Sequence, residues 1–348
     1  MAHRIVLLPG DGVGPEVTDA ARLVLEKTST AHDIALDFEE HDFGGCAIDA
    51  HGDPFPETTA AACGQADAVF LGAVGGPKWD RGGPRPEAGL LALRAALGTF
   101  ANLRPITVFE GLEHLSPLRA ERVRGVDLLI MRELTGGIYF GEKVEGNELA
   151  SDLCAYSRGE VERIARMAFE AARLRDGRVT SVDKANVLAS SRLWRKVVQD
   201  VRDADYPDVA LDHVLVDAMA MKLIDAPARF DVVLTENMFG DILSDEASVL
   251  AGSIGLAPSA SLSETHGGLF EPIHGSAPDI AGKDIANPVG AILSAAMLLR
   301  HALGEDAAAR AIENAVSRCL QAGETTRDIG GTHGCRSFAE AIVANIDA

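Results

Sequence analysis

The first hundred residues alternate short apolar runs with stretches in which apolar side chains recur every three or four positions. The apolar runs predict β-strands at 4–8, 34–39 and 67–71. The helical spacing predicts helices at 15–27, 57–65 and 87–97. Strands that alternate with helices favour an α/β sheet covered by helices. Residues 73–89 are too rich in Gly and Pro for regular structure, so we expect a long binding loop there.

The order of elements changes in the middle of the chain. Consecutive strands without intervening helices are predicted at 99–108, 126–132 and 137–144. Further strands are predicted at 178–182, 209–216 and 231–234, and helices at 160–174, 190–201, 217–224 and 241–251. A second Gly- and Pro-rich stretch is expected to be a loop at 252–290, before helices at 289–302, 306–321 and 336–346. The pattern predicts two α/β domains.

Composition narrows the class of protein. The chain has 348 residues, of which 47% are hydrophobic, and its 52 acidic and 32 basic side chains give a formal net charge of −20. This charge disfavours nucleic acid and anionic membrane surfaces as partners, because both bind clustered Lys and Arg. No apolar stretch has the length of a membrane span. The five cysteines are scattered without a Cys-x-x-Cys pair, which indicates reduced thiols in a cytoplasm and disfavours structural zinc.

The turn at 8–15, Leu-Pro-Gly-Asp-Gly-Val-Gly-Pro, lies between a predicted strand and a predicted helix. Its glycines suggest a dinucleotide-binding motif, but the Rossmann spacing is missing after Gly12. Pro15 suits the first turn of a helix, where its missing N–H has no cost. We therefore predict a tight strand-to-helix connection and not a pyrophosphate site.

Acidic side chains provide a candidate metal site. Asp241 and Asp245 are four residues apart on a predicted helix, so they share one face and can reach one ion. Together with Asp217 they would suit Mg²⁺ or Mn²⁺. Acidic residues near a helix start also cap free N–H groups, and the spacing alone leaves both interpretations open.

Other polar residues stand in apolar surroundings. Three arginines suit either structural ion pairs or an anion site, namely Arg94, Arg104 and Arg132. Lys184 and Tyr139 could transfer protons, or could be a surface Lys and a packed Tyr. The segment 271–283 combines small residues with Glu271, His274 and Asp279, and it is either a ligand-binding segment or a plain surface loop.

Taken in order, these segments resemble the metal-dependent β-decarboxylating dehydrogenases, the isocitrate/isopropylmalate dehydrogenase family. The resemblance extends from the turn at 8–16 to Asp-Ile-Gly-Gly at 328–331. Its most specific blocks are Asn-Met-Phe-Gly-Asp-Ile-Leu-Ser-Asp-Glu at 237–246 and Glu-Pro-Ile-His-Gly-Ser-Ala-Pro-Asp-Ile-Ala-Gly at 271–282. It implies a two-domain isopropylmalate/isocitrate dehydrogenase-like α/β fold and not a Rossmann fold. The discontinuous cofactor domain would comprise 1–99 plus 253–348, and the domain with the dimer interface 100–252.

The resemblance also implies roles for the candidate residues. Asp217, Asp241 and Asp245 would hold one Mg²⁺ or Mn²⁺, and Asp217 would also contact the substrate. Arg94, Arg104 and Arg132 would bind the substrate's carboxylates. Lys184 would accept the hydroxyl proton and Tyr139 would protonate the enolate. Lys184 and Asp217 would act in the active site of the partner subunit of a homodimer.

The implied cofactor is NAD, bound by the two long loops, and Asp279 favours NAD over NADP because it suits a free ribose hydroxyl. The implied cofactor contacts are Gly75, Gly76, Pro77, Glu87, Glu271, His274, Gly275, Ser276, Ala277, Asp279 and Asn287. A requirement for K⁺ is left open. Leu90 and Leu91, next to Glu87 on one helix, and Val187 would form an apolar pocket for an isopropyl group.

The implied reaction is NAD-dependent oxidative decarboxylation of 3-isopropylmalate in leucine biosynthesis, in the cytoplasm. Another 3-substituted malate, such as homoisocitrate or tartrate, is the nearest alternative substrate. Two alternatives come from other classes of protein: a non-catalytic regulatory subunit that keeps the fold, and an aspartate-based metal hydrolase.

Overall fold

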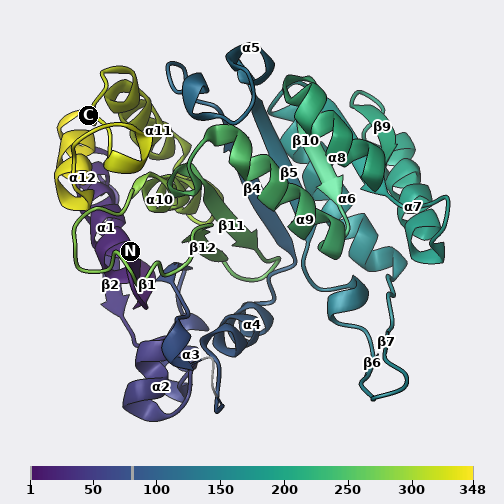
Figure 1. Ribbon diagram of the computed structural model, residues 1–348, viewed down its shortest axis with the longest axis horizontal. Helices are drawn as coiled ribbons and strands as arrows, with labels where there is room; N and C mark the ends of the chain where they lie inside the picture. Colours follow the sequence, from purple (N-terminus) through teal and green to yellow (C-terminus); the bar gives the residue numbers. More distant parts are fainter. Residues whose placement is uncertain (1, 80–81, 348) are drawn as a thin grey trace. The chain divides into compact units, whose positions relative to one another are not determined.

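The structure is a computed structural model that describes residues 2–79 and 82–347 (Figure 1). The chain divides into two compact units. Unit 1 comprises residues 1–99 and 253–348, and unit 2 comprises residues 100–252. Both units are α/β, which confirms the predicted fold class. The cofactor and interface roles expected of these ranges remain predictions.

The strands of unit 1 are β1 (His3–Gly10), β2 (Leu36–Glu40), β3 (Ala68–Ala73), β11 (Pro258–Leu262) and β12 (Leu269–Pro272). Their order is β2-β1-β3-β12-β11, parallel except for the antiparallel pair of β11 and β12. The apolar run of β1 is buried on both faces, as expected for a parallel strand between two helix layers.

The helices of unit 1 are α1 (Gly14–Ala31), α2 (Gly45–His51), α3 (Glu57–Cys63), α4 (Pro86–Leu97), α10 (Val289–His301), α11 (Asp306–Gln321) and α12 (Cys335–Ala344), with short 3₁₀ turns at Pro77–Trp79, Ile254–Leu256 and Arg327–Ile329. α1 and α10 pack on the sheet, and α11 and α12 pack on them. On the other face Val6 and Leu8 share a buried cluster with Leu93 and Leu97 of α4. The two cofactor-loop candidates emerge from this layered core.

The strands of unit 2 are β4 (Ala101–Thr107), β5 (Asp127–Glu133), β8 (Arg178–Asp183), β9 (Ala210–Leu215) and β10 (Val232–Thr235), and a small separate hairpin consists of β6 (Lys143–Val144) and β7 (Ser151–Asp152). The order is β4-β5-β10-β8-β9. β4 pairs antiparallel with β5, and the remaining pairs are parallel. Polar side chains at the carboxyl ends of β5, β8 and β10 therefore emerge at the same edge of the sheet.

The helices of unit 2 are α5 (Ala120–Val123), α6 (Arg158–Arg173), α7 (Ala189–Asp205), α8 (Val216–Asp225) and α9 (Asn237–Ser248), with 3₁₀ turns at Glu113–Leu115, Gly137–Tyr139, Pro227–Arg229 and Val249–Ala251. A capping box of Ser157 and Glu160 starts α6, because each side chain accepts a backbone N–H of the other residue. α6 and α7 pack on one face of the strands, while α8 and α9 pack on the other and on each other.

Some sequence predictions of secondary structure are wrong or incomplete. The strand expected at 137–144 is a 3₁₀ turn followed by the two-residue β6. The loop expected at 252–290 contains β11 and β12, and helix α2 was not predicted at all. α9 begins at Asn237, four residues before its predicted start. α2, β11 and β12 are short, and the Gly, Ser and Pro residues among them carry weak local preferences.

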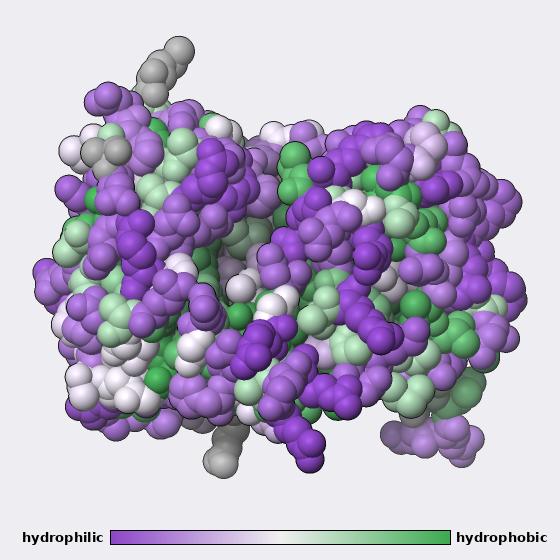
Figure 2. Space-filling view, turned by 90° about the horizontal axis from the view of Figure 1, so that it is seen from above, coloured by the Kyte–Doolittle hydropathy of each residue, from purple (hydrophilic) through white to green (hydrophobic). Residues whose placement is uncertain are grey.

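The surface is mostly hydrophilic, as expected from the many charged residues of the chain. Hydrophilic side chains cover most of the face seen in Figure 2, and the apolar areas between them are small and separate. No helix in the described part of the chain is both long and apolar enough to span a bilayer. All five cysteines are unpaired thiols.

Candidate active site

The candidate active site of unit 2 gathers where β5 ends beside α9 (Figure 1). Gly240 permits this contact, because a Cβ there would lie 2.7 Å from Cβ of Arg132 and 2.3 Å from Oγ1 of Thr235. The close approach brings the next residue, Asp241, against Arg132. The close packing of β5 against α9 therefore explains why a glycine directly precedes Asp241, a candidate metal ligand.

Arg132 is the most buried cation of this cluster, with 8% of its side chain exposed. Its Nη1 donates to Oδ1 of Asp241, while Nε and Nη2 both donate to Oδ1 of Asn237, at 3.1 and 2.9 Å. The guanidinium also lies 5.8 Å from the ring centroid of Tyr139. A buried guanidinium requires such partners, and they fix the direction in which the fork points.

Arg104 forms a second pair with the same helix. Its Nη1 donates to Oδ1 of Asp245 and to Oγ of Ser244, each at 2.8 Å. Its Nε donates to Oδ1 of Asn102, one pleat back on β4. Asp241 and Asp245 thus share one face of α9, as predicted, and each faces an arginine.

Tyr139 completes the cluster from the 3₁₀ turn Gly137–Tyr139. Its hydroxyl donates to Oδ2 of Asp241 at 3.0 Å. Burial, and then the bond to Asp241, raise the pKa of Tyr139 above its ordinary value. The hydroxyl therefore keeps its proton at neutral pH, which a general acid requires.

Lys184 and Asp217 form a separate pair. Lys184 directly follows β8, and its Nζ donates to Oδ1 of Asp217, in the first turn of α8, at 2.5 Å. This bond lowers the pKa of the Asp217 carboxyl. Within residues 2–79 and 82–347 no three His, Cys, Asp or Glu residues lie close enough to hold one metal ion. The three aspartates are therefore not brought together within a single chain.

Arg94 and Glu271 are paired in unit 1. Arg94 Nη2, on α4, donates to Oε1 of Glu271, on β12, at 2.7 Å. Both side chains are largely buried, at 23% and 12% exposed. Glu87 starts the same helix, and its Oε1 would lie 3.0 Å from a Cβ at Gly75. A substrate candidate and three cofactor candidates thus lie within one unit.

The apolar candidates differ in their exposure. Leu91 is 57% exposed and Val187 is 63% exposed, so both side chains are open to solvent in this chain. Leu90 instead packs in part against the core of unit 1. Leu91 and Val187 are therefore available to an apolar ligand, and Leu90 is available to a smaller extent.

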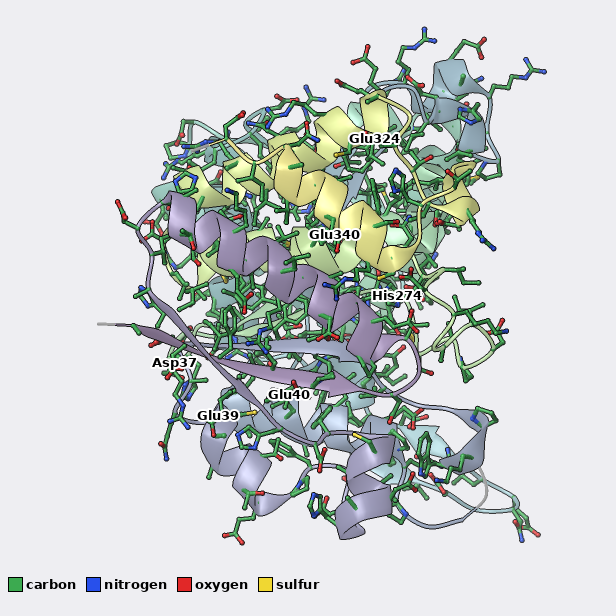
Figure 3. The ribbon with its side chains drawn as sticks, turned by 90° about the vertical axis from the view of Figure 1, so that its left-hand side faces the viewer. Asp37, Glu39, Glu40, His274, Glu324 and Glu340 are labelled. Carbon is green, nitrogen blue, oxygen red and sulfur yellow. The ribbon has the colours of Figure 1, made fainter. Side chains whose placement is uncertain are left out.

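The second cofactor-loop candidate follows β12. Ala277 adopts a φ of 38°, which is uncommon for a residue with a side chain. His274 Nδ1 bonds to the carbonyl of Gly275, whereas Nε2 is buried with no partner in the described part of the chain. Burial lowers the pKa of His274, so its ring is neutral at pH 7. Figure 3 locates His274 beside the C-terminal helices.

The remaining loop candidates have different surroundings. Ser276 is buried, whereas Gly275 and Asp279 are exposed. Asn287 donates through Nδ2 to Oδ2 of Asp328 at 3.0 Å, and its Oδ1 accepts the N–H of Val289. Gly76 and Pro77 continue the first loop from Gly75 into a 3₁₀ turn. The structure thus places these candidates on loops of one unit.

Asn237 was not predicted from the sequence as a site residue. Besides holding Arg132, Asn237 donates through Nδ2 to the carbonyl of Gly136, and its N–H donates to the hydroxyl of Tyr156. It therefore fixes both an arginine of the cluster and the turn that carries Tyr139. Its one local signal is its place in the block 237–246, where the aspartates drew attention instead.

Comparison with known proteins defines the class. The isocitrate/isopropylmalate dehydrogenase family matches residues 4–342, so the chain belongs to that family, and the predicted resemblance is confirmed.

Individual relatives were found both by sequence and by structure. A protein of Staphylococcus saprophyticus named 3-isopropylmalate dehydrogenase is 56% identical, with 96% of each chain covered. Among solved structures, the isocitrate dehydrogenase of Methylococcus capsulatus matches with a TM-score of 0.87 and 38% identity, covering 99% of each chain. A β-decarboxylating dehydrogenase of Thermococcus kodakarensis matches with a TM-score of 0.84 and 40% identity, covering 99% of this chain and 96% of that one.

Proposed function

We propose that this protein catalyses the NAD-dependent oxidative decarboxylation of (2R,3S)-3-isopropylmalate to 4-methyl-2-oxopentanoate, a step of leucine biosynthesis in the cytoplasm. The observation that carries the proposal is the cluster of Arg104, Arg132 and Tyr139 with Asp241 and Asp245 in unit 2. It combines two groups that bind carboxylates, a neutral acid and two carboxylates on one face of a helix.

The arginines would bind the dianionic substrate. Arg104 and Arg132 each present a guanidinium fork that suits a carboxylate, and Arg94 would provide a third. In the structure each is paired with an Asp or Glu of the same unit. Substrate binding therefore requires these ion pairs to exchange, with substrate carboxylates replacing those of the protein.

Lys184 and Tyr139 would move the two protons. Lys184, through Asp217 or water, accepts the proton of the substrate's C2 hydroxyl as the hydride leaves C2. After CO₂ departs, the Tyr139 hydroxyl donates a proton to C3. NAD supplies the hydride acceptor, and a divalent cation supplies electrostatic stabilisation of the negative charge that develops on the C2 oxygen.

Two observations support these cofactors. Asp241 and Asp245 are oxygen donors on one helix face, the ligand type that Mg²⁺ and Mn²⁺ prefer. A third carboxylate, Asp217, would come from the partner subunit. For NAD, the neutral His274 ring has a buried Nε2 without a described partner, which suits a polar group of a nucleotide. Asp279 is exposed and would accept a ribose hydroxyl.

The substrate class is tested with a panel of 3-alkylmalates, homoisocitrate and tartrate, each with NAD and NADP in the presence of Mn²⁺. We expect the highest kcat/KM for 3-isopropylmalate with NAD, because Leu91 and Val187 are exposed apolar side chains. A preference for a tricarboxylate would contradict the substrate assignment. Absence of NADH formation with every compound would favour a regulatory subunit, and metal-dependent hydrolysis without NAD would favour a hydrolase.

We also propose a homodimer with shared active sites. α8, α9 and the 3₁₀ turn Val249–Ala251 that follows α9 expose apolar side chains that a second copy would cover, namely Met221, Ile224, Ile242 and Val249. Complementation tests the sharing: inactive Lys184→Met and inactive Tyr139→Phe proteins are unfolded together and refolded as a mixture. If Lys184 serves the partner's site, each hybrid dimer has one intact site, and activity returns to about a quarter of the wild-type value. If Lys184 serves its own site, no activity returns.

A further inference from the structure

Asp11 lies in the turn between β1 and α1 and is almost fully buried, with 5% exposed. Its carboxylate accepts three backbone N–H groups. Oδ2 accepts those of Gly45 and Gly75, at 2.8 and 2.9 Å, and Oδ1 accepts that of Cys46 at 2.8 Å. Gly75 belongs to the first cofactor-loop candidate, and Gly45 and Cys46 start α2. One side chain thus fixes three donors from segments 34 to 64 residues away.

The segment that Asp11 holds continues into the rest of the same loop. Trp79 lies against Gly45, where a Cβ would come within 2.2 Å of the indole. Trp79 Nε1 and Lys78 Nζ both donate to Asp49 of α2. The segment 75–79 is therefore held at both ends. Asp11 binds its first residue, Gly75, and α2 binds its last two residues, Lys78 and Trp79.

Glu16 makes the corresponding contacts to the second loop. It lies in the first turn of α1, and its Oε1 accepts the N–H of Gly282 while Oε2 accepts that of Asp284 at 3.1 Å. Asp284 has a φ of 52°, a conformation that a residue with a side chain adopts only when its surroundings hold it. The fork of Glu16 therefore fixes the segment that follows Asp279.

The backbone of the same turn also contacts both loops. The N–H of Asp11 donates to the carbonyl of Ala73 at 2.8 Å, and that of Val13 donates to the carbonyl of Ser276 at 2.7 Å. A Cβ at Gly12 would lie 1.9 Å from the Ser276 carbonyl oxygen. The glycines of this turn thus allow it to approach the protein's own backbone, which confirms the prediction of a tight connection.

We propose that Asp11 and Glu16 are positioning residues for the cofactor, which act through the backbone N–H groups of the 73–79 and 276–284 loops. The inference rests on the proposed NAD site and concerns two residues outside it. Apart from the end of β3 and the 3₁₀ turn Pro77–Trp79, each loop is backbone that no sheet or helix orders, so its conformation depends on acceptors supplied from elsewhere. A carboxylate suits this role because both of its oxygens accept and neither donates.

Isosteric amides test the inference. In Asp11→Asn and in Glu16→Gln one oxygen becomes an NH₂ group, so at least one backbone N–H faces a donor in place of an acceptor. Loss of one charge-assisted bond in a buried site should raise the dissociation constant for NAD by about tenfold. Calorimetry with NAD alone measures this constant without any turnover.

Kinetics separates positioning from general damage. We expect KM for NAD to rise in both variants, while kcat at saturating NAD and KM for 3-isopropylmalate stay within about twofold of wild type. Asp37→Asn and Glu40→Gln are matched controls, because they make the same substitutions at exposed positions on β2 of the same unit (Figure 3). The controls should leave all constants unchanged.

Hydrogen exchange gives a readout independent of the cofactor. In Asp11→Asn the amides of residues 45, 46 and 75 should exchange faster, and in Glu16→Gln those of 282 and 284, with the core strands unaffected. Glu16 is more exposed than Asp11, so Glu16→Gln keeps the inference testable if Asp11→Asn does not fold.

The outcomes are distinguishable. Wild-type affinity for NAD in both variants would overturn the positioning role and leave the proposed function intact. A wild-type protein that binds NAD without oxidising 3-isopropylmalate would contradict the proposed reaction but not the positioning role. A wild-type protein that does not bind NAD would overturn both the proposed cofactor and this inference. Equal losses of kcat and of both affinities would indicate general damage and contradict the inference.

Discussion

The candidate site of unit 2 and the loops of unit 1 are built in different ways. In unit 2, charged side chains face one another directly: Arg132 bonds to Asp241, and Arg104 to Asp245. In unit 1, apart from Glu87 and the paired Arg94 and Glu271, the cofactor candidates lie on backbone loops, which Asp11 and Glu16 hold through N–H groups. A site made of paired charges can exchange partners with an ionic substrate. A site made of tethered loops offers a fixed shape to a cofactor.

This difference separates the expected effects of mutation. If the proposed function holds, a side chain of the unit 2 cluster would participate in the chemistry, and its loss should lower kcat. A residue of the unit 1 loops would contribute binding that is equal in the ground and transition states, and its loss should raise KM for the cofactor. A large fall in kcat on substitution of a loop residue would contradict this separation of kcat effects in unit 2 from KM effects in unit 1.

The largest effect is expected for Tyr139→Phe, which removes the hydroxyl that donates to Asp241. Loss of the proton donor should lower the rate of product formation by about a hundredfold or more, while hydride transfer is less affected. Single-turnover measurements of NADH and of 4-methyl-2-oxopentanoate distinguish the two steps. Tyr206→Phe removes a hydroxyl elsewhere in unit 2 and should turn over normally. Unchanged turnover in Tyr139→Phe would remove this residue from the mechanism.

Asp245→Asn tests the metal assignment. A neutral amide is a weaker ligand for a hard cation, so the affinity for Mn²⁺ should fall about tenfold or more. The variant also removes the carboxylate that faces Arg104, whereas Asp225→Asn removes a similarly exposed carboxylate that faces Arg122. A Mn²⁺ titration of both variants therefore separates metal binding from loss of an ion pair. Equal titration curves would contradict the ligand assignment.

Much of unit 2 could be predicted from the sequence because its signals are local. Asp241 and Asp245 share a face through helical spacing alone, and the apolar runs identify β5, β8 and β10. The pairing of these carboxylates with Arg132 and Arg104 could not be predicted, because it depends on how β4 and β5 pack against α9. Asn237 was missed for the same reason, since its partners lie about a hundred residues away.

The arrangement of unit 1 was harder to predict. β11 and β12 are short, and their order arises from pairing with each other and with β3, which no local pattern reveals. The turn at 8–15 was correctly predicted as a connection. The role of Asp11 could not be inferred from it, because a carboxylate that accepts distant backbone N–H groups leaves no periodic signal.

Asp279→Lys tests the cofactor role of the unit 1 loops, and we expect it to have a smaller effect than the two variants of unit 2. Replacing an acceptor for the ribose hydroxyl by a cation should lower the ratio of kcat/KM for NAD to that for NADP by about tenfold. The change should act through KM, because Asp279 is an exposed loop residue outside the charged cluster. Asp37→Lys makes the same change of charge on β2 and should not alter the ratio. A fall in kcat with both cofactors would instead assign Asp279 to the chemistry.

Each unit also contains a buried carboxylate, Asp11 in unit 1 and Glu236 in unit 2. Asp11 and Glu236 are 5% and 3% exposed, and burial raises the pKa of both. Three backbone N–H groups counteract this rise at Asp11. Glu236 lies directly before α9, and its side chain accepts a hydrogen bond from the hydroxyl of Ser191, while nearby Asp183 adds repulsion. Its pKa is therefore raised from 4.5 to about 7.

The smallest effect on catalysis is expected for Glu236→Gln, which should instead change the pH dependence of stability. Between the unfolded pKa of 4.5 and the folded pKa of about 7 the folded protein binds more protons, so its unfolding free energy falls as pH rises through this window. The fall attributable to Glu236 is about 3 kcal/mol and should disappear in the variant. Urea unfolding of both proteins at pH 5 and pH 8 measures it, with the exposed Glu148→Gln as control. Parallel pH profiles for wild type and Glu236→Gln would show that this carboxyl is already ionised at pH 5 and would contradict the prediction.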